Sequence, residues 1–147
     1  AIAPGHGLAA VGRLRAALAA AVPLPRESNP MPAALRALSL ARQRALVVLM
    51  MDLDDVGSHG QLRQAVRLLR PKHLPVVCGL LNPDLQEIGG RQARRWLDPY
   101  TSLAATEQVT RLSAAAAALR QLGAPVVLSH PARFEDAVFA TYDRMRA

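Results

Sequence analysis

Three short apolar runs divide the chain, and polar or turn-forming residues follow each of them. They cover residues 45–51, 75–81 and 124–128. Short runs rich in Val and Leu predict β-strands. The run 45–51 has no polar interruption, and this predicts a strand that is buried on both faces.

Between and around these runs, apolar residues recur every three or four positions, which predicts amphipathic helices. Helices are expected at residues 7–21, 32–42, 58–69, 99–122 and 131–145. The ends of helix 99–122 are the clearest, with Asp98 as a cap, Pro99 in the first turn and Gly123 after the last residue. Alternation of strands and helices predicts an α/β fold: a Rossmann-like parallel sheet of three strands with helices on both faces.

The composition is that of a single soluble domain, with 147 residues of which 51% are hydrophobic. No apolar run reaches the roughly 18 residues that a bilayer span requires, so no membrane segment is predicted. The one cysteine, Cys78, lies in an apolar run and predicts a buried thiol in a reducing, cytoplasmic compartment. Since the chain begins without Met, we expect a piece of a longer protein, and a membrane anchor upstream stays open.

The net charge of +7 raises the question of nucleic-acid binding. The arginines are spread along the predicted helices, and only residues 91–95 form a tight group. Aromatic residues make up 3% of the chain, which leaves few side chains on which bases can stack. We therefore interpret the charge as a solvated basic surface and predict no nucleic-acid partner.

Three carboxylates, Asp52, Asp54 and Asp55, directly follow the first strand. Parallel sheets bind ligands outside the carboxyl ends of their strands, and carboxylate oxygens suit Mg²⁺. The alternative is a polar turn. Asp54 and Asp55 are expected to cap the helix 58–69. For Asp52, two roles stay open: a residue of the turn and a contact to a metal ion.

Other candidate chemistry is sparse. His130 follows the third strand and is expected to share a crevice with Asp52, but no nucleophile elbow, phosphate loop or zinc spacing is present. Glu27 and Ser28 are expected to form a polar loop near Asp52 or to cap the next helix. Trp96 is expected to anchor against the core, and Tyr142 to pack with its hydroxyl at the rim.

The order of these elements resembles the C-terminal part of domain-of-unknown-function family 58. These bacterial proteins carry a von Willebrand factor type A-like domain and are often encoded near MoxR-type AAA+ ATPases. The match lies in RQRALVVLMMDLDD, LRQAVRLLRPKHLPVVCGLLNPDL, LRQLGAPVVLSHPARF and AVFATYDRMRA. The resemblance implies that residues 1–147 are the C-terminal part of one such α/β domain, here a truncated version.

The resemblance also implies a magnesium site above the sheet. An Asp-x-Ser-x-Ser loop, a Thr and an Asp build this site in the family. Asp52 matches the Asp, and Ser28 is the nearest candidate for the Thr, but the Asp-x-Ser-x-Ser segment is absent from the chain. We therefore expect no cofactor in this chain and Mg²⁺ only in a full-length protein.

Two functions remain open. The favoured one is a non-enzymatic module that binds a protein partner, such as an AAA+ ATPase. The alternative is an α/β enzyme or nucleotide-binding protein that uses the crevice at the strand ends. If the neighbouring strand is absent, the edge of 45–51 is bare and predicts a homo-oligomer, unless residues 1–25 fold back over that edge.

Overall fold

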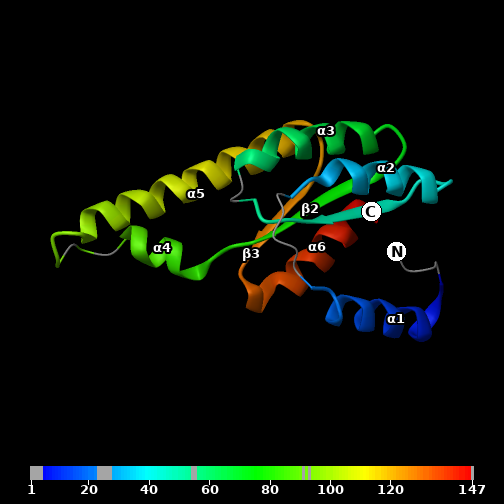
Figure 1. Cartoon of the computed structure of the whole chain (residues 1–147), viewed down its shortest axis with the longest axis horizontal. Helices are drawn as coiled ribbons and strands as arrows, with labels where there is room; N and C mark the ends of the chain where they lie inside the picture. Colours follow the sequence, from blue (N-terminus) through cyan, green and yellow to red (C-terminus); the bar gives the residue numbers. More distant parts are fainter. Residues whose placement is uncertain (1–4, 23–27, 54–55, 91, 93, 147) are drawn as a thin grey trace.

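Figure 1 shows the computed structural model, which describes residues 5–22, 28–53, 56–90, 92 and 94–146. The fold is α/β, as predicted. Its elements in chain order are α1 (Gly7–Ala19), α2 (Pro30–Leu40), β1 (Leu46–Met50), η1 (Val56–Ser58), α3 (His59–Leu69), β2 (Leu74–Leu80), α4 (Pro83–Gly90), α5 (Asp98–Gln121), β3 (Val126–Ser129), η2 (Pro131–Arg133) and α6 (Phe134–Arg146).

The three strands form one parallel sheet in the order β1-β2-β3, which confirms the predicted topology. Val48 of β1 lies beside Val76 of β2, and Val77 lies beside Val126 of β3. Parallel strands need a crossover, and α3 and α5 supply the two crossovers here.

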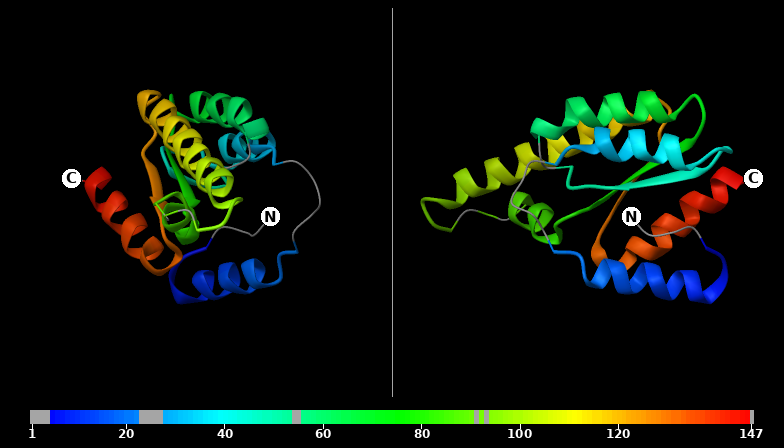
Figure 2. Two further views of the ribbon diagram at one scale, coloured as in Figure 1. Left: turned by 90° about the vertical axis from the view of Figure 1, so that its left-hand side faces the viewer. Right: turned by 45° about the vertical axis from the view of Figure 1, so that its right-hand side comes forward.

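Helices α2, α3 and α5 lie on one face of the sheet (Figure 2). Leu62, Val66 and Leu69 of α3 are fully buried there, because α3 has a strongly apolar face. They share one core with Leu49 of β1 and Val77 of β2. The main core of the domain therefore lies between the sheet and these three helices.

The opposite face of the sheet is only partly covered. Helix α6 packs Phe134 and Val138 against Val76 and Cys78 of β2 and Val127 of β3. Since residues paired across a parallel ladder point to the same side, the β1 residues on this face are Leu46, Val48 and Met50. They are 37%, 40% and 67% exposed.

The prediction that strand 45–51 is buried on both faces is therefore wrong. Only Leu49 of β1 is buried, and the burial alternates along the strand. The physical reason is position: β1 is the edge strand of the sheet, and α6 covers β2 and β3 instead. We call the exposed side chains of Leu46, Val48 and Met50 the open face of β1.

Helix α1 lies apart from the rest of the fold (Figures 1 and 2). None of its residues is buried, and its apolar positions Leu8, Val11, Leu14 and Leu18 are each at least 50% exposed. The alternative in which the N-terminal segment covers β1 is therefore not observed for α1. No described helix combines the length and apolar character that crossing a bilayer requires.

Two local predictions around α5 were wrong. The cap residue of α5 is Leu97, and Asp98 is its first residue; the Asp98 Oδ2 atom accepts the backbone N–H groups of Arg94 and Arg95 at 2.7 and 2.8 Å. Trp96 does not anchor in the core: it is 78% exposed, and its ring meets the Tyr100 ring edge-on at 6.5 Å. Gly123 does follow the C-cap with φ +75°, as the prediction of the helix end required.

Candidate functional site

A crevice of about 710 Å³ lies at the carboxyl ends of the strands, where parallel sheets bind ligands. Its walls come from the ends of β1 and β2, the turn after β2, and the beginning of η2 and α6. Asp52, Cys78 and Asn82 contribute its polar or ionisable side chains, and most other lining residues are apolar, such as Met50, Leu80 and Phe134.

The polar groups of this crevice are few and partly engaged. Asn82 Oδ1 accepts the backbone N–H of Asp84 at 3.0 Å, so it caps the start of α4. Burial raises the pKa of the Cys78 thiol, because desolvation disfavours the thiolate. The thiol is therefore protonated at neutral pH and a poor nucleophile.

Gly79 of β2 also lines the crevice. A Cβ atom at this position would lie 3.1 Å from a Leu128 side-chain carbon and 3.2 Å from one of Leu53. Such contacts are tighter than usual, so glycine lets β2 pack between the two leucines without a shift of either side chain. The residue serves packing, and it adds no chemistry to the crevice.

The described structure does not bring the two predicted metal ligands, Asp52 and Ser28, into one crevice. Asp52 is exposed on the crevice wall, and Ser28 is exposed in the segment before α2 and does not line the crevice. Among the described residues, no group of three or more His, Cys, Asp or Glu side chains is placed to hold a metal ion. The described residues therefore do not fit the magnesium site that the family resemblance implies.

Ser28 is not the helix cap either. Asn29 is the N-cap of α2, and its Oδ1 atom accepts the backbone N–H of Met31 at 3.0 Å. Glu27, Asp54 and Asp55 lie outside the described residues, so the loop and capping roles expected for them stay predictions. Ser58, the residue before α3, makes no side-chain capping bond.

His130 and Asp52 do not share the crevice as expected. Asp52 lines it, whereas His130 does not, although its neighbour Pro131 does. The nearby Ser129 hydroxyl donates to the His130 backbone carbonyl at 3.4 Å, a long bond that does not involve the ring. The arrangement of these three residues does not make a nucleophile and base pair.

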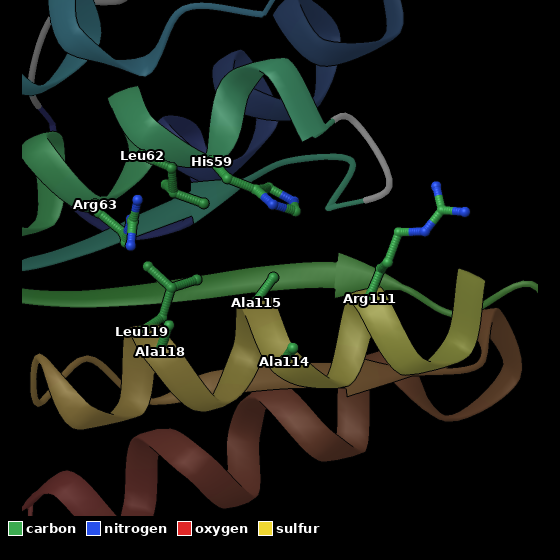
Figure 3. A pocket seen from close by; sticks show the side chains of 8 residues that line it. All are labelled: His59, Leu62, Arg63, Arg111, Ala114, Ala115, Ala118 and Leu119. Carbon is green, nitrogen blue, oxygen red and sulfur yellow. The ribbon is translucent and has the colours of Figure 1, made fainter. Parts of the chain in front are cut away.

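A second, smaller cavity of about 300 Å³ lies between α3 and α5 (Figure 3). His59 and Arg63 line it from α3, and Arg111 lines it from α5, over a floor of alanines. The His59 Nε2–H donates to the Leu53 carbonyl at 2.7 Å, and Arg111 pairs with Glu107 at 2.9 Å. His59 and Arg111 are therefore already engaged, and the short alanine side chains of α5 leave the space between the two helices.

Sequence analysis missed a basic pocket at the opposite end of the sheet, where Arg44, Arg67, Arg70 and His73 come together. The available signal was that basic residues precede each of the first two strands, at Arg42 and Arg44 and at residues 70–73. Because these basic residues are separated along the sequence, their pattern predicts only a solvated basic surface.

Comparison with known proteins gives no relative: no family model, no curated protein and no solved structure matches the chain.

Proposed function

We propose that the chain is a non-enzymatic protein-interaction module of von Willebrand factor type A-like type. The observation that carries the proposal is the open face of β1. Its three apolar side chains lie on an edge strand, next to the apolar crevice that Met50 also lines. Exposed apolar surface that continues into a groove is typical of protein-binding sites.

The backbone of β1 supports the same function. In the described sheet, β1 pairs with β2 on one side only. An edge strand presents unpaired N–H and C=O groups, to which another chain adds by strand pairing. Main-chain hydrogen bonds along β1 would then provide affinity, while the side chains of the open face select the partner and its register.

The crevice chemistry favours binding over catalysis. Among the described residues that line it, the ionisable side chains are Asp52 and Cys78, and burial keeps the Cys78 thiol protonated. General acid–base or nucleophilic catalysis needs two positioned groups of matched reactivity. A mostly apolar crevice beside an open edge is better suited to a partner's side chains.

The first partner to test is a second copy of this chain, joined through β1 in a two-fold dimer. A stable interface buries roughly 800 Å² on each partner, which is more than the side chains of β1 alone provide. Exposed Phe139 and Tyr142 of α6 and the apolar stripe of α1 offer the additional area. A MoxR-type AAA+ ATPase is the second partner, which the family resemblance suggests.

Light scattering at tens of micromolar tests the proposal. We expect a dimer mass for the natural chain and a monomer mass for Val48→Lys, because the new charge cannot be buried against the copy. Leu103→Lys is the matched control: Leu103 is 59% exposed on α5, away from β1, and its substitution should leave the dimer intact.

Two results contradict this dimer. One is a monomer mass for the natural chain, in which case binding of a purified MoxR-type ATPase to the natural chain and to Val48→Lys becomes the decisive comparison. If the ATPase binds the natural chain no better than it binds Val48→Lys, the interaction module is refuted. The other is loss of the circular dichroism spectrum in Val48→Lys, which would mean that the open face is covered within one chain.

A further inference from the structure

The basic pocket lies at the amino ends of β1 and β2, opposite the crevice. It has a volume of about 570 Å³. Its polar side chains are those of Arg44, Arg67, Arg70, His73 and Gln121. The remaining lining is largely apolar and includes Leu74, Leu122 and Met145. Among the described residues that line it there is no Asp or Glu.

The charge of this pocket exceeds what the local structure needs. Helices α3 and α5 both end here, and each helix C-terminus carries about half a negative charge. The three guanidinium groups outweigh these two helix ends by about two positive charges. Stabilisation of the helix ends therefore accounts for only part of the cluster.

The three arginine side chains also lack polar partners among the described residues. Within the described part of the chain, no hydrogen bond or ion pair joins the side chains of Arg44, Arg67 or Arg70 to another residue. The end of α3 is closed by backbone bonds instead, such as the His73 N–H to the Leu69 carbonyl at 2.8 Å.

The guanidinium of Arg70 lies against Gly123. Gly123 has φ +75°, and the Arg70 guanidinium occupies the space where a Cβ atom at this position would stand. The end of α5 therefore leaves room for the guanidinium of Arg70 at the pocket wall. This fit is independent of the charge argument, since it concerns shape.

His73 adds a buried donor. The residue is 1% exposed, and its Nδ1 atom accepts the backbone N–H of Ala45 at 3.3 Å. This bond uses the Nδ1 lone pair, so the proton of the neutral ring is on Nε2. Nε2 has no hydrogen-bond partner in the described structure. Buried donors are rarely left without an acceptor, and an anion in the pocket would provide one.

We propose that this pocket binds a small phosphorylated molecule. Guanidinium groups match phosphate oxygens with two parallel hydrogen bonds, and Arg44, Arg67 and Arg70 bring three of them to one pocket. His73, which also lines the pocket, offers its unpartnered Nε2–H as a further donor to the same anion. The volume exceeds that of a phosphate group alone and lies in the range of small-molecule sites, and the apolar lining accommodates an organic part.

Isothermal titration with inorganic pyrophosphate, at fixed ionic strength, tests the proposal. We expect saturable binding in the submillimolar range. Arg67→Gln and Arg70→Gln should each weaken it about tenfold, because each removes a charge-assisted hydrogen bond. AMP should bind at least as tightly as inorganic phosphate, since its organic part finds the apolar lining.

Arg63→Gln is the matched control. Arg63 is on the same helix and carries the same charge, but it lines the cavity between α3 and α5. Its substitution should change the affinity by less than about twofold, as expected for a screened surface charge. His73→Asn keeps an acceptor for the Ala45 N–H and removes the Nε2 donor, so it should weaken pyrophosphate binding while Arg63→Gln does not.

Three results overturn the proposal. The first is the absence of saturable pyrophosphate binding below about 10 mM, an affinity too weak for a built site. The second is equal weakening by Arg63→Gln and Arg67→Gln, which would mean unspecific attraction to a basic surface. The third is exclusion of AMP by a pocket that binds inorganic phosphate. If His73→Asn fails to fold, the arginine variants still decide the outcome.

Discussion

Neighbouring residues of β1 should differ sharply in their contribution to stability. Leu49 is 8% exposed and belongs to the main core with Leu62 and Val77, so Leu49→Ala leaves a cavity and should cost about 2–5 kcal/mol of unfolding free energy. Val48 is 40% exposed on the open face. Removal of two methyl-sized groups that are little more than half buried should cost about 1 kcal/mol.

Urea denaturation followed by circular dichroism measures both costs, provided that the slope of the transition is unchanged. The comparison is well matched in position, because both substitutions end in Ala at neighbouring residues of the same strand. Val→Ala loses more β propensity than Leu→Ala, which works against the expected order and makes the test stricter. The measurement belongs at low micromolar concentration, since a dimer would stabilise the natural chain by mass action. If Val48→Ala costs as much as Leu49→Ala under these conditions, the open face is covered in solution and the reasoning from its exposure fails.

Three further predictions concern the crevice. Calorimetry should show magnesium binding no tighter than millimolar, because the described oxygens do not form a site; micromolar binding that Asp52→Ala abolishes would contradict this. The chain should not hydrolyse esters, peptides or nucleotides above an inactive control, and an activity lost in His130→Ala or Asp52→Asn would refute that expectation. Burial raises the pKa of the Cys78 thiol, so the folded protein binds this proton more tightly than the unfolded chain does. The resulting contribution to the free energy of unfolding is fully present below the unfolded pKa of about 8.5. It is lost as the pH rises through the raised pKa of the folded state. The resulting alkaline loss of unfolding free energy should be smaller in Cys78→Ala, and identical pH profiles would count against it.

The elements that sequence analysis predicted well are those with a local signal. The three strands are short apolar runs between turn residues, and Gly123 marks the end of α5 by a backbone angle that favours glycine. Helix α3 shows a regular apolar face, and its core residues Leu62, Val66 and Leu69 follow from spacing alone. These features depend on residues within one or two turns of each other.

Two of the three missed features depend on distant parts of the chain. The apolar run of β1 cannot reveal that α6 covers only β2 and β3, because that choice is made some 80 residues later by the path of α6. Helix α4 was missed because it is 8 residues long and ends in two glycines, a composition that favours a loop. The basic pocket combines Arg44, Arg67 and His73 from the segment before β1, helix α3 and the segment before β2, and only the folded chain brings them together.

The two proposals can fail separately, because the surfaces that carry them do not share residues. Val48 lies on the face that α6 only partly covers, whereas Arg67 belongs to α3 on the opposite face. Substitutions without shared partners usually act additively. Val48→Lys should therefore leave pyrophosphate affinity unchanged, and Arg67→Gln should leave the dimer intact. A change of pyrophosphate affinity in Val48→Lys, or of the dimer mass in Arg67→Gln, would mean that anion binding and partner binding are coupled. The coupling would run through β1, because Arg44 lines the pocket at its amino end and Met50 lines the crevice at its carboxyl end.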